Sequence, residues 1–289
     1  MKSRYVMTMV LSLCLSSVFT KQVEAQTQSV YHSEVDVTLT VRSVSLLPVF
    51  DNLRGIYSRP VETALTEKLK NSHHWDYSDA NYSGPVTTPE ELEEAPDSVK
   101  SICASLPADA FISASVVKGP SGVSIKMDLF LKSDKKLLAQ EFVNSIQRFD
   151  VESIKHQSEE ILDKLLRHLP YGGVVLSRQG TRVTVNMGRQ DGIEPEQIIS
   201  VIQIIKANRH PKFNFLISSE KEILGKIKLL KVDDTLSFGR IVTEKESGAI
   251  QVNSKIANLE SVTYTNTDTL SEVHSGEDTL PERHPILFR

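Results

Sequence analysis

The sequence contains little cysteine and few aromatic residues. Its 289 residues include two cysteines, one tryptophan and 6% aromatic side chains. Only Cys103 lies outside the N-terminal segment, and one thiol cannot form an internal disulfide, so stability has to come from a packed core. The formal net charge of −4 excludes the basic surface that is typical of nucleic-acid-binding proteins. Beyond the N-terminal segment there is no run of about 18 apolar residues, so we expect no transmembrane segment.

The first residues are typical of an export signal. Lys2 and Arg4 give a positive start, and the apolar run at 6–19 is too short to span a membrane comfortably. Small residues then precede Gln26, which we expect to be the first residue of the mature protein. With 1–25 as a signal peptide, the sequence predicts that the chain is exported.

The two cysteines lie in different contexts. Cys14 lies in a segment that is similar to a lipoprotein cleavage box, but Leu13 occupies the position that needs a small residue. We therefore do not expect lipidation. Cys103 lies on the apolar side of a predicted helix, which favours a buried structural thiol over a reactive one.

Residues 26–170 show the pattern of an α+β domain. Apolar residues at every second position predict a strand over 35–41. Ser58 is the expected N-cap of an amphipathic helix. Thr88 and Glu91 have the spacing of a capping box and predict the start of another helical region.

Three strands and a closing helix follow in the same domain. The segments 108–117, 123–132 and 137–148 are separated by turns and are predicted to be strands. Asp150 is the expected cap of a helix over 151–169. This order of elements predicts a mixed sheet with covering helices.

A break in the helical pattern near residue 170 marks the expected domain boundary. Residues 171–256 contain many short strand segments separated by turns, which predicts a small β-barrel-like domain. Residues 257–289 are rich in Thr, Ser and acidic side chains, so we expect a disordered acidic tail.

The tail ends in an apolar cluster, Ile286, Leu287 and Phe288. An unstructured segment of this kind can dock on a partner by adding a strand to an open sheet edge. The alternative interpretation is a chain end that carries incidental apolar residues. Both interpretations stay open at this point.

The stretch RVTVNMGRQDGI at 182–193 contains the glycine pair that most resembles a phosphate loop. Such a loop needs a lysine and a hydroxyl residue just after its last glycine, at the start of a helix. Here Ile, Glu and Pro follow Gly192, and a strand is predicted next. We therefore interpret Gly188 and Gly192 as turn residues with positive φ, with Asp191 hydrogen-bonded to the turn backbone. We expect no cofactor.

A second group of polar residues, HHWD, occupies 73–76. Adjacent histidines are expected to point in different directions, and no spaced partner pair lies nearby, so we expect no metal site. A nucleophile elbow is also missing, so we predict no catalytic residues. A competing class is a periplasmic solute-binding protein or hydrolase, for which the best candidate residues are His73, Asp76 and Asp51.

Part of the first domain resembles a known fold signature. VSLLPVFDN, a capped helix and then SLPADAFISASVV are similar to the N-terminal domain of TolB and to related domains of CsgG-type and flagellar-assembly proteins. The matching residues are Leu46, Leu47, Pro48, Phe50, Asp51, Asn52, Ala108, Asp109 and Ala110. The resemblance implies a domain that binds other proteins or assembles into rings, without catalysis.

The second domain resembles the C-terminal domain of the flagellar assembly protein T family. The similar segments are VTVNMGRQDGI and, about thirty residues later, ILGKIKLLKVDDTLSFGRIV. The matching residues are Gly188, Asp191, Gly192, Gly225, Val232, Ser237 and Gly239. Gly188, Asp191, Gly192, Gly225 and Gly239 are expected to be structural turn residues.

Together the two resemblances imply a non-enzymatic periplasmic scaffold or assembly protein. They imply a place in a ring around the flagellar basal body, close to the outer membrane, with other envelope or basal-body proteins as partners. An oligomeric or ring-shaped assembly is expected. Within the same class, the alternative is an accessory subunit of another envelope complex, of the secretion or curli type.

Overall fold

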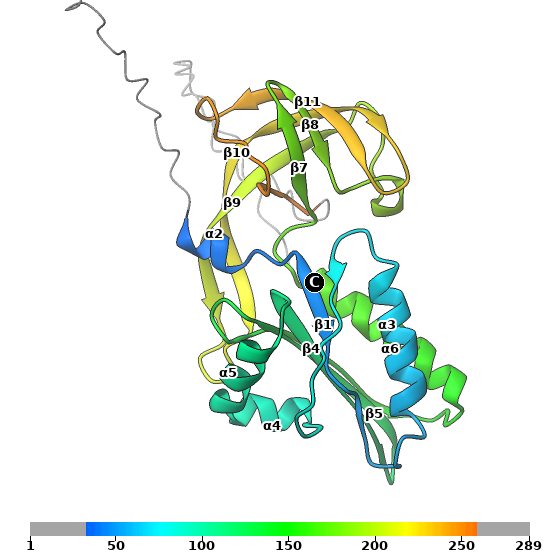
Figure 1. Ribbon diagram of the computed structural model, residues 1–289. Helices are drawn as coiled ribbons and strands as arrows, with labels where there is room; N and C mark the ends of the chain where they lie inside the picture. Colours follow the sequence, from blue (N-terminus) through cyan, green and yellow to red (C-terminus); the bar gives the residue numbers. More distant parts are fainter. Residues whose placement is uncertain (1–32, 259–289) are drawn as a thin grey trace, which may run out of the picture.

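The computed structural model describes residues 33–258 and contains two β-sheets (Figure 1). One is a six-stranded mixed sheet, and the other is a closed barrel of six strands. This architecture confirms the predicted α+β class with a mixed sheet, covering helices and a barrel. The predicted signal peptide, Cys14, and the tail end with Ile286, Leu287 and Phe288 lie outside the described residues. The domain boundaries near residues 170 and 256 stay predictions.

The mixed sheet contains β1 (Ser43–Leu46), β2 (Phe50–Asp51), β3 (Asp76–Tyr77), β4 (Ala110–Gly119), β5 (Gly122–Leu131) and β6 (Leu137–Ile146). Its strand order is β3-β1-β4-β5-β6, and β2 pairs with β4 beyond the end of β1. The pairs that involve β1, β2 and β3 are parallel. The pairs β4-β5 and β5-β6 are antiparallel. The sheet is therefore parallel at one side and a simple meander at the other.

Helices cover both faces of the mixed sheet (Figure 1). The helices are α3 (Ser58–Lys70) and α6 (Val151–Arg167) on one face, and α4 (Pro89–Glu94) and α5 (Pro96–Ser105) on the other. Successive strand residues point to opposite faces, so Ile112 packs with α3 and α6 while Phe111 packs with α4 and α5. Cys103 is buried in the second core, as predicted. Among residues 33–258, no helix has the length and apolar character to cross a membrane.

Side-chain caps begin the helices that the sequence marks most clearly. At α4, the Thr88 hydroxyl accepts from the Glu91 N–H and the Glu91 carboxylate accepts from the Thr88 N–H, which confirms the capping box. Asp150 caps α6 as predicted. The prediction for α3 is wrong in one detail. Ser58 is the first helical residue, and the Asp51 carboxylate accepts its N–H at 2.8 Å.

The strand predicted over 35–41 is wrong at its start, because a short helix, α2 (Glu34–Thr38), forms there. Val37 is exposed instead of alternating with buried neighbours. The helical turn places Asp36 against the barrel, where its carboxylate accepts the Ile204 N–H at 2.8 Å. Long-range contacts of this kind outweigh a weak local preference for a strand.

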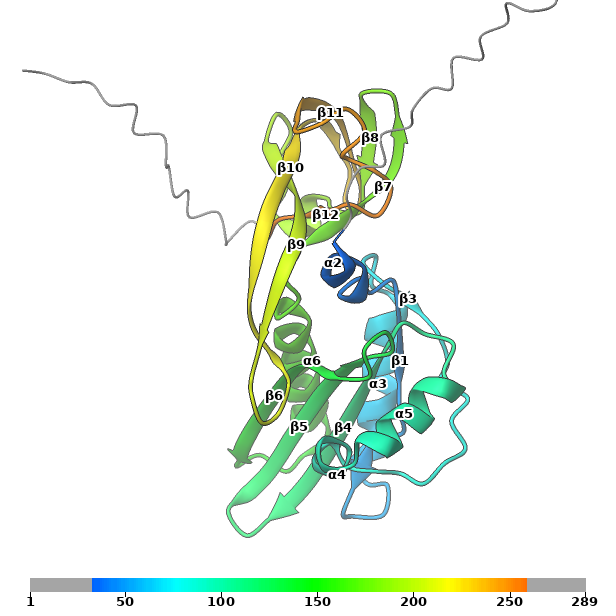
Figure 2. The same cartoon turned by 90° about the vertical axis from the view of Figure 1, so that its left-hand side faces the viewer.

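The barrel contains β7 (Gly173–Gln179), β8 (Arg182–Val185), β9 (Ile198–Arg209), β10 (Leu216–Val232), β11 (Ser237–Glu244) and β12 (Lys255–Ile256). It closes in the order β10-β11-β8-β7-β12-β9. A single turn of 3₁₀ helix, η1 (Arg189–Asp191), lies between β8 and β9. With 12 and 17 residues, β9 and β10 form a long hairpin that extends from the barrel toward the mixed sheet (Figure 2).

The hairpin of β9 and β10 contacts the mixed sheet near its tip. The Arg209 guanidinium, at the end of β9, pairs with Asp134 at 2.5 Å and donates to the Leu137 carbonyl at 2.8 Å. Leu137 begins β6, the edge strand of the sheet. Only 15% and 18% of the two charged side chains are exposed, so this ion pair is largely shielded from water.

A buried ion pair holds α2 on the barrel. The side chain of Lys255 in β12 is fully buried, and its ammonium group pairs with Asp36 Oδ2 at 2.8 Å. It also donates to the Asp36 carbonyl at 2.6 Å and to Thr40 Oγ1 at 2.8 Å. Burial lowers the pKa of Lys255, and the Asp36 carboxylate opposes that shift. All three N–H donors of the ammonium group therefore have an acceptor.

We predict that Lys255→Met lowers the free energy of unfolding by about 3–5 kcal/mol, because the Asp36 carboxylate is left without its counter-charge. Adding Asp36→Asn should recover part of this loss, since the amide oxygen can still accept the Ile204 N–H. Urea unfolding of both single variants and the double variant measures the coupling. Strictly additive losses would show that the two side chains do not act as a pair.

A second buried carboxylate lies in the mixed sheet. The Asp128 side chain on β5 is 0% exposed, and its nearest cation, Lys126 Nζ, is 3.9 Å away. Neither carboxylate oxygen has a hydrogen-bond partner within residues 33–258. Lys126 also pairs with Glu93, and with Glu90 at 3.4 Å. Burial raises the pKa of Asp128 to about 8, while Lys126 opposes the rise and Glu93 adds to it.

Asp128 makes stability depend on pH. Its pKa is higher in the folded state than in the unfolded chain, so the folded state binds the extra proton between about pH 4 and pH 8. Stability must fall as the pH rises through that window, with a slope of at most about 1.4 kcal/mol per pH unit for one group. We predict a flatter profile for Asp128→Asn and a more stable variant near pH 8. Urea unfolding at several pH values tests this, and equal slopes in both proteins would contradict it.

Candidate functional site

A cleft of about 740 Å³ lies between the ends of two helices and the barrel. Its walls come from the end of α3 and the residues after it, from the last turns of α6, and from the turn that contains η1. Trp75 and Tyr171 supply aromatic surface, and Lys68 and Arg167 supply positive charge. The cleft thus combines residues next to the mixed sheet with residues of the barrel, and these two groups lie far apart in sequence.

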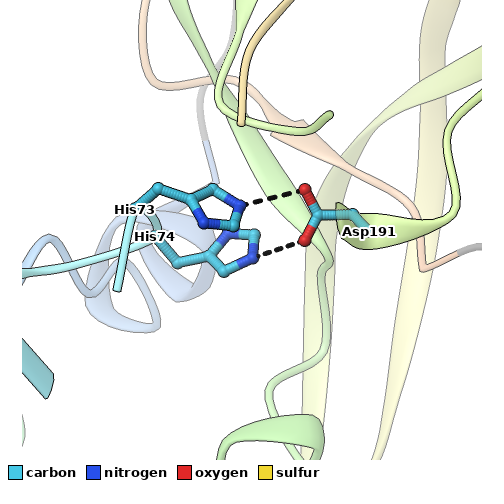
Figure 3. Close-up of side chains that lie close together, drawn as sticks. All are labelled: His73, His74 and Asp191. Atoms are coloured by element: carbon cyan, nitrogen blue, oxygen red, sulfur yellow. Dashed lines mark hydrogen bonds and ion pairs between the residues drawn. The ribbon is translucent and has the colours of Figure 1, made fainter. Parts of the chain in front are cut away.

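Three side chains with ligating atoms meet at this cleft (Figure 3). His73 Nε2 lies 3.0 Å from Asp191 Oδ2, and His74 Nε2 lies 2.8 Å from Asp191 Oδ1. The centroids of the two imidazole rings are 4.0 Å apart. The expectation that the adjacent histidines point in different directions is wrong. They occupy a bend between α3 and β3, where no regular helix or strand separates neighbouring side chains.

The barrel holds the Asp191 carboxylate through the turn backbone. Asp191 is the last residue of η1, and its Oδ2 also accepts the Gly188 N–H at 2.7 Å. Gly192 has a φ of 77°, but Gly188 has a φ of −142°, so the expectation of positive φ at both glycines is wrong for Gly188. A Cβ on Gly188 would lie 2.4 Å from the Asp234 carbonyl oxygen. Close approach of the turn after β10 therefore requires glycine at this position.

Hydrogen bonds keep the Asp191 carboxylate ionised. Burial raises its pKa, but hydrogen bonds from His74, the Gly188 N–H and His73 outweigh burial and hold the pKa below its usual value. Lys68, which lines the same cleft, pairs with Asp163 at 2.8 Å and is therefore compensated. The arrangement can fasten the bend after α3 to the barrel by hydrogen bonds. Two imidazole nitrogens and a carboxylate are also ligands that transition metals bind.

The three residues expected for a solute-binding or hydrolytic site are not brought together. His73 lines the cleft, but Asp76 is exposed in β3. The Asp51 carboxylate accepts N–H groups in the turn before α3, from Leu53, Gly55, Tyr57 and Ser58. Burial raises the pKa of Asp51, but these hydrogen bonds lower it below its usual value. Asp51 is thus occupied in shaping the backbone.

The expectation that Gly225 and Gly239 are turn residues is wrong, because they lie in β10 and β11, in the barrel wall and away from the residues that line the cleft. A Cβ on Gly225 would lie 2.3 Å from the Thr243 carbonyl oxygen, and one on Gly239 would lie 2.5 Å from Ile227 Cγ2. Both glycines sit where neighbouring strands approach closely, which leaves no room for a side chain.

Reasoning from sequence considered His73 and His74 together but rejected them as a site, and it missed the contacts of both histidines with Asp191. His74 and Asp191 are 117 residues apart, so no local spacing connects them. The available signal was the histidine pair itself. The partner of the histidine pair, Asp191, could be identified only from the structure, in which η1 lies against the end of α3.

Comparison with protein-family models finds no match, and comparison with curated proteins finds none either. Among solved structures, TolB from Acinetobacter baumannii is 12% identical over 71% of this chain and 61% of the TolB chain, with a TM-score of 0.30. Lipoprotein GNA1162 from Neisseria meningitidis is 12% identical, covers 44% of this chain and 99% of its own, and has a TM-score of 0.26. The LpoB C-terminal domain from Salmonella enterica is 13% identical, covers 38% and 85%, and has a TM-score of 0.26. The chain thus spans less than two thirds of the TolB chain, and at these TM-scores no property of the three proteins is transferred to it.

We predict that Gly188→Ala lowers the free energy of unfolding by about 2–3 kcal/mol, because the new methyl group would overlap the backbone of Asp233 and Asp234. Gly119→Ala is the matched control. Its Cβ would meet the Gly122 carbonyl oxygen at 3.7 Å, which is an ordinary contact, so a change below about 0.5 kcal/mol is expected. Urea unfolding compares the two variants. Equal losses of stability in the two variants would show that the close approach of the Asp233 and Asp234 backbone is not what requires glycine at position 188.

Proposed function

We propose that this chain is a non-enzymatic assembly protein of the cell envelope and that the outer face of its barrel binds the next copy in a ring. The finer assignment that we propose is a ring of the flagellar basal body at the outer membrane. The export signal expected over 1–25 supports an envelope location. The motifs that resemble the flagellar assembly protein T family support the flagellar assignment.

One observation carries the proposal: large apolar side chains are exposed on four strands of the barrel. Each of the following is between 41% and 59% exposed: Leu176, Ile198, Ile205, Ile217, Ile223, Leu230, Phe238 and Val242. They belong to β7, β9, β10 and β11. Phe238 lies opposite Lys231 on the neighbouring strand, next to Leu230. Exposed patches of apolar side chains are typical of surfaces that contact other proteins.

The connections between barrel and mixed sheet support the same function. The barrel is attached through the ion pair of Lys255 with Asp36, through Arg209 at the hairpin tip, and through Asp191 at the cleft. Attachments at separate places restrict rotation of the barrel. Its apolar face is therefore presented at a fixed orientation, which a closed ring of identical subunits needs.

We predict that deletion of the gene removes or disorders the outer-membrane ring of the basal body and impairs swimming. The wild-type chain should restore both, and the double variant Leu230→Asp with Phe238→Asp should not, because charged groups would then occupy the contact face. Ile56→Asp is the matched control, since Ile56 is 58% exposed but lies before α3. In-situ imaging of basal bodies is the measurement, with immunoblotting to show equal protein levels.

Normal rings and swimming after deletion would contradict the flagellar assignment. An accessory role in a secretion or curli-type complex would then take its place. Full restoration by the double variant would contradict the role of the barrel face, even if the deletion itself has the expected effect.

A further inference from the structure

The cleft brings together nitrogen and oxygen atoms in an arrangement that a metal ion can bind. Ligand atoms of His73, His74 and Asp191 all lie within 4.8 Å of one another. The three side chains are 20%, 23% and 14% exposed. Most of each side chain is therefore covered by protein. An ion and water can still reach the three side chains through the cleft that they line.

The separations between these groups are close to those of a zinc site. Zn²⁺ binds imidazole nitrogen at about 2.0–2.1 Å and carboxylate oxygen at about 2.0–2.2 Å, in tetrahedral geometry. Two tetrahedral ligands at such distances lie about 3.3–3.4 Å apart. His74 Nε2 lies 2.8 Å from Asp191 Oδ1, and this separation would have to widen by about half an ångström. His73 Nε2 lies 3.0 Å from the other oxygen, Oδ2, and its imidazole would have to turn toward the ion. Small side-chain rotations achieve such a change.

We propose that His73, His74 and Asp191 bind one Zn²⁺ ion through three protein ligands, with a water molecule from the cleft as the fourth. The ion would bind the bend after α3 and the turn of the barrel at the same time. It would therefore strengthen the attachment of the barrel to the helical layer. This inference does not depend on the proposed function in the envelope.

The carboxylate is already oriented for this role. The Gly188 N–H donates to Asp191 Oδ2 at 2.7 Å, so Oδ1, which His74 Nε2 contacts in this structure, is the oxygen that would bind the ion. Hydrogen bonds from an outer partner fix the orientation of a metal ligand and strengthen binding. Here that partner is a backbone group, so the orientation does not depend on a second flexible side chain.

The ligand set favours zinc over magnesium or calcium. Mg²⁺ and Ca²⁺ prefer oxygen ligands in sets of about six or more, whereas two of the three ligands here are imidazoles, which suit zinc. Of the cations that line the cleft, Lys68 is paired with Asp163, and Arg167 remains as the charge that opposes a bound cation. The Asp191 carboxylate offsets that opposition.

The purified full chain, prepared without a polyhistidine tag, should bind one Zn²⁺ per molecule in calorimetric titration, and Mg²⁺ should not compete. Co²⁺ used as a probe should give the intense visible absorption of a four-coordinate site. At a free Zn²⁺ concentration about 100 times the Kd, the melting temperature should rise by roughly 5–10 °C. No binding of Zn²⁺ by the wild-type chain would overturn the proposal.

Variants identify the ligands. His73→Ala and His74→Ala should each weaken Zn²⁺ binding by more than the roughly 10- to 100-fold that is typical of an outer partner, and the double variant should lose stoichiometric binding. Asp191→Asn keeps an acceptor for Gly188 and should also weaken binding. His156→Ala is the matched control, because His156 is 69% exposed on α6, and it should bind as wild type does. Unchanged binding in a double histidine variant that is folded by circular dichroism would overturn the assignment.

Discussion

The buried ion pair between Lys255 and Asp36 is the interaction on which the arrangement of the molecule depends. A fully buried ammonium group is tolerated only when its charge is balanced and each N–H has an acceptor. Lys255 lies in β12, the strand that closes the barrel between β7 and β9. All of its acceptors come from the segment around α2. The first described segment of the chain must therefore pack against the strand that completes the barrel.

The packing of the α2 segment against β12 also fixes the barrel where the cleft forms. Once the barrel is fixed, η1 lies against the end of α3, and the Asp191 carboxylate meets the imidazoles of His73 and His74. The site is a product of the contact between two layers rather than of a motif in either one. The proposed zinc ion and the proposed ring contact are consistent with each other, since the ion would reinforce the attachment that holds the apolar barrel face in position.

Signals that act between neighbours in sequence predicted most of the fold. The capping box at Thr88 and the cap at Asp150 depend on residues within one helical turn, and both are present. Predictions failed where distant contacts decide the outcome. The start of the strand expected over 35–41 is instead a short helix, α2, whose Asp36 carboxylate accepts the Ile204 N–H of the barrel. The contact of His74 with Asp191 was missed because it joins an irregular bend to a turn far along the chain.

The hairpin of β9 and β10 gives the molecule a mechanical property. One part of the hairpin forms part of the barrel wall, and the rest extends toward the mixed sheet (Figure 2). Arg209 fixes the far end of the hairpin to the edge of that sheet. A β-strand is already close to its full length, so a pull along the hairpin meets nearly inextensible backbone. Tension applied to the barrel along the hairpin is thus carried to β6, at the edge of the mixed sheet. The hairpin therefore couples the barrel to the mixed sheet against a pulling force.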